Sequence, residues 1–168
     1  MIEIKPLAEK QAKLDKLIEE RVQTYNPQFR LDTVETVDKI KFAFKVELSE
    51  LANEVGFFKY WKQSHEMDRE KVLEEWADCL HFLLSVSNLK RWIPFIPTME
   101  FGTEIEFFHV DGLFYELLQN PLDSSGQAVQ AFLSLFALGL KLGYTEEELI
   151  QAYYGKYAKN IARQKEGY

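Results

Sequence analysis

The sequence has few of the residues that cross-link or interrupt a chain. It contains one cysteine, Cys79, among 168 residues, which excludes an internal disulfide and indicates a reducing compartment. Glycine and proline number only 8 and 5, and no low-complexity tract is present. No segment approaches the roughly 20 apolar residues that span a bilayer, and residues 1–10 hold no run of signal-peptide length. We therefore expect a cytoplasmic protein without a membrane partner.

The chain also lacks an excess of positive charge. Its formal net charge is −7 and its pI is about 5.1, which argues against binding to nucleic-acid polymers. A small anion is not excluded, because a metal ion and a few cationic side chains are enough to hold one. With 46% hydrophobic and 14% aromatic residues, residues 1–168 are expected to form one domain with a buried core.

Two segments place pairs of acids along the edge of an apolar helix face. In residues 45–62, KVELSELANEVGFFKYWK, Glu47 and Glu50 lie three apart beside an apolar stripe. Further on, Glu75 and Asp78 repeat this spacing beside a second stripe. The two stripes consist of Phe44, Leu48, Leu51 and Val55, and of Val72, Trp76, Cys79, Phe82, Leu83 and Val86.

Two such helices, packed antiparallel, would bring Glu47, Glu50, Glu75 and Asp78 into one small volume. The repulsion among these carboxylates makes the arrangement unstable without a cation. Hard divalent ions take oxygen ligands and keep open positions for water and phosphate, so we predict about one to three Mg²⁺ ions per site.

Two other interpretations of the acids remain open. Pairs at i,i+3 are common on solvated helix faces. Di-iron carboxylate proteins place an acid and a histidine at i,i+3, as in Asp78 with His81 and Glu106 with His109. This second alternative is disfavoured, because His81 projects about 120° from Glu75, where a surface or interface histidine is expected.

A cationic strip is expected near the end of the chain. It consists of Lys156, Lys159, Asn160 and Arg163, whose offsets put them on one helix face. Basic residues in a last helical turn also complement the helix dipole. Both explanations hold together, because a four-acid metal site needs cations for the substrate's phosphates.

The rest of the chain is predicted to be all-helical. Helices are expected at 6–24, 33–63, 69–89, 112–119 and 125–142, and a capping box at 145–148 begins the last one. An irregular, aromatic-rich insertion occupies 92–112, with a weak strand signal at 103–107. Gln11 and Asp15, four apart on the first helix, are solvated or contact a ligand, and Trp61 packs in a core or dimer or stacks on a base.

At these residues the sequence resembles the all-α NTP pyrophosphohydrolases, which include MazG-related enzymes. Their hallmark, E-x-x-E followed by E-x-x-D, corresponds here to the acids 47, 50, 75 and 78. Within that superfamily the chain is most similar to the dimeric all-α dUTPase family. The similarity rests on ELSELANE followed by FKYWK, on Gln11 and Asp15, and on the C-terminal pattern KNxxRQxxGY.

The resemblance implies a helical bundle with a four-helix core, a homodimer, and Mg²⁺-dependent hydrolysis of dUTP and dUDP to dUMP. Such an activity removes dUTP from the nucleotide pool and supplies dUMP, a precursor of dTMP. The four acids would bind metal, with Glu47 or Glu50 orienting or deprotonating the attacking water. The cationic strip would meet phosphate or sugar, and Gln11, Asp15 and Trp61 would contact the base.

Two alternative functions remain. One is pyrophosphohydrolysis of another nucleotide, such as dCTP or a broad set of NTPs. The other is a non-enzymatic helical binding module whose acids hold a structural cation.

Overall fold

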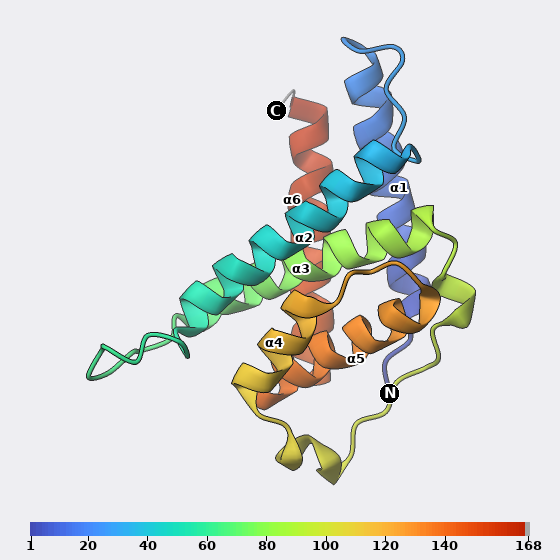
Figure 1. Ribbon diagram of the computed structural model, residues 1–168. Coiled ribbons are helices and arrows are strands. Elements are labelled where there is room, and N and C mark those ends of the chain that lie inside the picture. Colours follow the sequence, from blue (N-terminus) through green and yellow to red (C-terminus); the bar gives the residue numbers. More distant parts are fainter. Residues whose placement is uncertain (167–168) are drawn as a thin grey trace.

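The computed structural model describes residues 1–166, which fold into six α-helices and two short 3₁₀ turns (Figure 1). The expectation of an all-α fold is confirmed, and within this range no residues form a strand beyond an isolated bridge between Ile2 and Met99. The elements are α1 (Ile4–Gln23), α2 (Val34–Val55), α3 (Arg69–Leu89), η1 (Ile93–Phe95), η2 (Thr103–Phe107), α4 (Val110–Gln119), α5 (Ser125–Lys141) and α6 (Glu146–Glu166). The final Gly-Tyr of the C-terminal motif lies outside the described residues.

Polar side chains set the starts of four helices. Thr33 accepts a hydrogen bond from the Thr36 backbone N at 3.2 Å, and Asp68 and Ser124 cap α3 and α5 in the same way. The predicted capping box is present, since Thr145 Oγ1 accepts from Glu148 N at 3.1 Å. The side chain of Glu148 accepts in return from Thr145 N.

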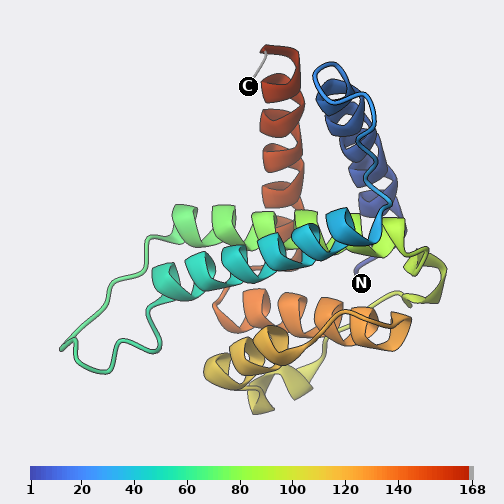
Figure 2. The same cartoon turned by 45° about the horizontal axis from the view of Figure 1, so that its top comes forward.

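The helices form three layers, with the α2–α3 pair in the middle (Figure 2). α2 and α3 run antiparallel and are joined by residues 56–68. α1 and α6 pack on one side of this pair, and α4 and α5 pack on the other (Figure 2). α3 contacts α1, α2, α5 and α6, and is therefore the central helix of the molecule.

The main hydrophobic core draws residues from every layer. Its members include one or more large side chains from each helix, among them Leu7, Phe44, Trp76, Phe114, Phe132 and Tyr153. The Trp76 ring N donates to the Leu135 carbonyl at 2.8 Å, which satisfies its polar edge inside the core. The prediction of one domain stays a prediction.

The sequence-based assignments differ from the structure at the end of α2, in residues 103–107 and at the start of α4. α2 ends at Val55 and not near residue 63, because Gly56 adopts a left-handed conformation (φ 71°) that stops the helix. Residues 103–107 form a 3₁₀ turn instead of a strand, since no neighbouring strand pairs with them in the described chain. In addition, α4 begins at Val110, two residues before the predicted start.

Within residues 1–166, no single helix is both long and apolar enough to cross a membrane. Only α5 and α6 taken together meet the length and composition test, and they are bent by 111°.

Candidate functional site

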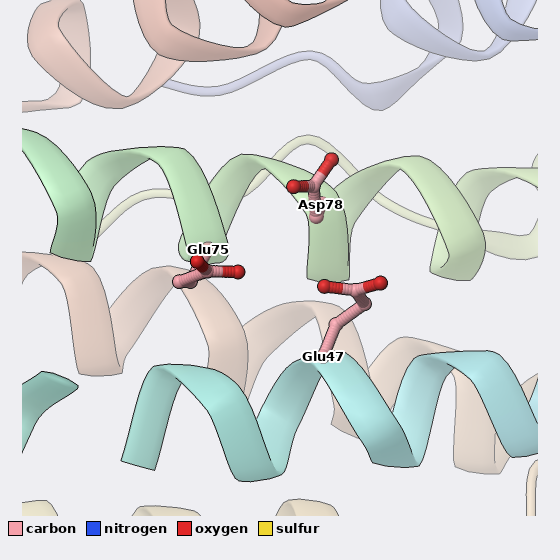
Figure 3. Close-up of side chains that lie close together, drawn as sticks. All are labelled: Glu47, Glu75 and Asp78. Carbon is pink, nitrogen blue, oxygen red and sulfur yellow. The ribbon is translucent and has the colours of Figure 1, made fainter. Parts of the chain in front are cut away.

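Three of the four predicted metal ligands meet between α2 and α3. Glu47 projects from α2 toward Glu75 and Asp78 on α3 (Figure 3). One carboxylate oxygen from each of the three lies within 4.8 Å of the others. The antiparallel packing of the two helices makes this possible, because it turns the acid edge of each helix toward the other. We call these three residues the carboxylate trio.

The fourth acid, Glu50, is exposed and does not belong to the trio. Its negative charge is nevertheless close enough to raise the pKa of both Glu47 and Glu75. Together with Glu75 it lines an open cleft that also includes Val46, Ser49 and Asn53. Glu50 therefore stands at the rim of the site, where water and substrate have access.

Burial and mutual repulsion shift the pKa values of the trio. Burial raises the pKa of Glu47 to about 7, and the neighbouring charges of Asp78, Glu50 and Glu75 add to this effect. Burial also raises the pKa values of Glu75 and Asp78. The chemistry of the donor set, three carboxylate oxygens held close together, suits a hard divalent cation.

The only cation in direct contact with the trio among the described ion pairs is Lys156, on α6. Its Nζ lies 2.6 Å from Asp78 Oδ2 and 3.1 Å from Glu74 Oε1. Burial lowers the pKa of Lys156, but the contacts with Asp78 and Glu74 outweigh burial and leave it raised. This lysine therefore carries its charge inside the acidic site.

Of the other strip residues, Lys159 Nζ lies 3.4 Å from Glu74 Oε1, and Arg163 Nη1 donates to Asn160 Oδ1 at 3.4 Å. The positive charge of Arg163 also acts to lower the pKa of Asp78, which places it near the trio. The strip and the acids thus face each other, as the sequence predicted.

Glu74 was missed by the sequence analysis. The signal was present, because Glu74 and Asp78 are four apart on α3 while Lys156 and Lys159 are three apart on α6. Opposite charges at matching helical spacings are typical of two helices that pack face to face. The packing of α3 on α6 could not be read from the sequence, so the match went unnoticed.

Gln11 and Asp15 lie in a buried polar cluster between α1 and α3. Gln11 Nε2 donates to Asp15 Oδ1 at 2.8 Å and to Ser85 Oγ at 2.9 Å, and Ser85 Oγ donates to the same Asp15 oxygen at 2.7 Å. Burial raises the pKa of Asp15 to about 6. Both residues are more than nine-tenths buried, so the interpretation as solvated polar residues was wrong.

His81 belongs to the same cluster, and its predicted surface location was wrong. The side chain is only 4% exposed and its ring stacks on Tyr153 of α6 with centroids 4.5 Å apart. His81 Nδ1 donates to Gln11 Oε1 at 2.6 Å, and burial lowers the histidine pKa to about 4. The prediction failed because α1 and α6 cover the side of α3 that carries His81. The apolar pattern of α3 alone had indicated that this side faces solvent.

The di-iron alternative finds no support within residues 1–166. The potential metal-ligand group in this range contains Glu47, Glu75 and Asp78 and no histidine. His109 precedes α4 and is exposed.

Trp61 is not brought to the other predicted base contacts. It lies in the segment 56–68, after α2 has ended, and is 63% exposed. This segment is at the opposite end of the α2–α3 pair from α1 (Figures 1 and 2). Its ring contacts those of Phe58 and Tyr60. A role for Trp61 in base binding stays a prediction.

Comparison with known proteins identifies the family of this chain. A family model described as dUTPase matches residues 3–168, whereas a search of curated protein sequences found no match. The matched range contains both acid-bearing helices and the basic last helix. Because the match extends over nearly the entire chain, the protein belongs to the dUTPase family and is an enzyme of the dUTP diphosphatase type.

Proposed function

We propose that this enzyme hydrolyses dUTP, and also dUDP, to dUMP with Mg²⁺ as the metal. The observation that carries the proposal is the carboxylate trio, in which one oxygen of each acid lies within 4.8 Å of the others, together with Lys156 in contact with it. Such an arrangement offers hard oxygen ligands for a divalent cation on one side and cationic groups for phosphates on the other.

The residues proposed to hold the metal are Glu47, Glu75 and Asp78, with Glu50 at the rim. A bound Mg²⁺ supplies Lewis acidity toward phosphate oxygens and acidifies a coordinated water. The trio fits such an ion because it combines concentrated negative charge with partial exposure, so that water and substrate still reach it. Few protein ligands and open positions for water and phosphate are the coordination that Mg²⁺ favours.

Glu47 and Glu50 are the proposed catalytic residues. The Glu47 carboxylate lies among the proposed metal ligands, within reach of a water that the metal would acidify. Glu50 is exposed at the open cleft and can orient the attacking water by accepting its hydrogen bond. Attack on phosphorus would then release dUMP.

Lys156, Lys159, Asn160 and Arg163 are proposed to bind the phosphates and the sugar. Their donors neutralise the charge that develops on phosphate oxygens during the reaction. Lys159 is 63% exposed at its side chain and is therefore accessible to a nucleotide, whereas Lys156 is largely enclosed.

Gln11 and Asp15 are proposed to recognise the base of the nucleotide through hydrogen bonds. The Gln11 amide carries one acceptor and two donors, and Asp15 Oδ2 has no hydrogen-bond partner among the described residues. With its pKa at about 6, Asp15 changes between acceptor and donor near neutrality. Trp61 is proposed as an aromatic surface on which a base stacks.

We further propose that the protein acts as a homodimer in the cytoplasm. Exposed apolar side chains on α2 and α4 support a dimer, since these helices pack together and share an outer surface. A free, buried Cys79 accords with a reducing compartment. No nucleic-acid polymer or membrane is proposed as a partner.

A nucleotide panel tests the proposal. Phosphate and pyrophosphate release should be measured for dUTP, dUDP, dCTP and ribonucleotides, with Mg²⁺ and with EDTA. Preferred hydrolysis of dUTP that EDTA abolishes is the expected result. Preference for another base would favour the broader pyrophosphohydrolase function, and absence of any product would favour the binding module.

A further inference from the structure

The carboxylate trio already holds a cation of the chain's own. The Lys156 ammonium lies 2.6 Å from Asp78 Oδ2, and the lysine side chain is only 10% exposed. An ammonium donates hydrogen bonds to carboxylates and neutralises part of their charge, as a metal ion would. Lys156 thus acts as an internal counter-ion of the site.

A divalent ion and this ammonium compete for Asp78. Mg²⁺ binds carboxylate oxygens directly, at about 2.0–2.1 Å, and therefore requires Asp78 to turn an oxygen toward it. The ammonium contacts Oδ2 of Asp78, and a cation on the other oxygen would still lie close enough for the like charges to repel and to weaken this contact. Metal uptake should therefore release the contact between Lys156 and Asp78.

The structure provides a second acceptor for the released ammonium. Glu74 Oε1 already lies 3.1 Å from Lys156 Nζ, one helical turn from Asp78 and outside the trio. Its side chain is 42% exposed, so it can follow the lysine toward solvent. The flexible four-carbon stem of lysine allows this shift by rotation of a few torsions.

We propose that Lys156 exchanges partners when the site takes up its metal, leaving Asp78 for Glu74. Glu74 is then a positioning residue that holds the ammonium at the edge of the site, beside Lys159, where the substrate's phosphates are proposed to bind. This inference rests on the proposed function, because it concerns the same metal ligands.

Calorimetric titration of Mg²⁺ into the nucleotide-free protein tests the exchange. Lys156→Met removes the competitor and should tighten Mg²⁺ binding by roughly fivefold to tenfold, while slowing turnover. Glu74→Gln removes the second acceptor and should weaken Mg²⁺ binding by about threefold, with Glu74→Asp restoring most of it.

Two matched variants control for charge alone. Lys159→Met removes a lysine that pairs with Glu74 and, among the described ion pairs, not with Asp78. Glu70→Gln removes an exposed acid one turn before Glu74 on α3. Each should change the Mg²⁺ affinity by less than about twofold, because neither residue forms an ion pair with Asp78 among the described residues.

The possible outcomes separate this inference from the proposed function. The exchange is supported if the wild type binds Mg²⁺, Lys156→Met binds it more tightly and Glu74→Gln binds it more weakly. Uptake with unchanged affinity in Lys156→Met, or equal effects of Glu74→Gln and Glu70→Gln, overturns the exchange and leaves the proposed function standing. Absence of uptake by the wild type overturns both. If Lys156→Met does not fold, the Mg²⁺ affinities of Glu74→Gln and Glu70→Gln decide whether the exchange occurs.

Discussion

At the scale of single residues, environment rather than residue type decides how the acids of this chain behave. Glu35 and Glu47 both lie on α2, yet their pKa values move in opposite directions. The hydrogen bond from Lys39 lowers the pKa of the exposed Glu35, whereas burial and three nearby acids raise that of Glu47 to about 7. Packing against other carboxylates therefore sets how readily Glu47 holds its proton in the metal-free protein.

The raised pKa of Glu47 makes metal-free stability depend on pH. The folded state holds this proton more tightly than the unfolded state, so the free energy of unfolding should fall as pH rises from 4.5 through about 7. Urea unfolding in EDTA across this range measures the effect. Glu47→Gln should flatten the profile, and an unchanged slope in that variant would contradict the assignment. Mg²⁺ affinity should rise over the same range, because the metal binds the deprotonated form.

Glu50 offers a test of catalysis that is separate from folding. Because the side chain is exposed, Glu50→Gln should leave the free energy of unfolding within about 0.5 kcal/mol of the wild type. It should still bind nucleotide but lose at least about 100-fold in kcat, since the amide cannot accept the proton or orient water equally well. Steady-state kinetics and nucleotide binding by fluorescence measure both. Asn53 is also exposed on this cleft, so Asn53→Asp serves as a control for a substitution at the rim of the cleft.

Full turnover by Glu50→Gln would remove Glu50 from the mechanism and leave Glu47 as the proposed base. Loss of nucleotide binding instead of turnover would assign Glu50 to substrate affinity.

Asp15 should lower the free energy of unfolding as pH rises from about 4 through about 6. Its pKa is raised from 3.8 to about 6, so the folded protein carries a costly buried charge once this group ionises. Asp15→Asn keeps an oxygen that accepts from Gln11 and Ser85, and should gain on the order of 2–3 kcal/mol relative to the wild type between pH 4 and pH 8. Urea unfolding at both pH values measures this difference. Glu9→Gln, at an exposed position of α1, should show no such change.

At the scale of elements, the local signals in the sequence located most helices. The starts of α2, α3, α5 and α6 were predicted to within a few residues, because capping depends on a few adjacent residues. The end of α2 was missed because the aromatic residues after Gly56 continue a helical spacing. The pattern of one helix also does not reveal how many neighbours cover it, which is why the burial of His81 was not predicted.

The same limit applies to the candidate site. Glu47, Glu75 and Asp78 were found because their spacing along α2 and α3 requires only that the two helices pack together. Glu74 depends on the contact between α3 and α6, which are far apart in sequence, and no local pattern specifies that contact.

Gly56 should be required for the sharp end of α2. Its φ of 71° disfavours any residue with a Cβ, and a Cβ there would also meet the His65 ring. Gly56→Ala should therefore lower the free energy of unfolding by about 1–2 kcal/mol, measured by urea unfolding. Gly112→Ala provides a matched control, because nothing lies within 4 Å of a Cβ at this helical position. That variant should gain about 0.5–1 kcal/mol, and equal losses in both would contradict the conformational argument.

At the scale of the whole molecule, the layered arrangement buries α3 and leaves α2 and α4 with an outer surface. Large apolar side chains remain exposed there, with Phe42 at 71% and Tyr115 at 54%. Leu118 of α4 is 38% exposed, and Val46 of α2, at 39%, lines the cleft beside Glu50. Exposed apolar side chains gathered on packed elements are typical of protein interfaces, so this surface is the proposed dimer contact.

Sedimentation equilibrium should find a particle of about twice the 19.7 kDa chain mass. Phe42→Glu places a charge within the proposed contact, where it would be desolvated without a partner, and should shift the protein toward monomer at micromolar concentration. Phe107→Glu makes the same change at an even more exposed position, 81%, in η2, outside the surface of α2 and α4. It should leave the dimer intact. A monomeric wild type would refute the dimer, whereas a dimer that survives Phe42→Glu would move the contact to another face of the molecule.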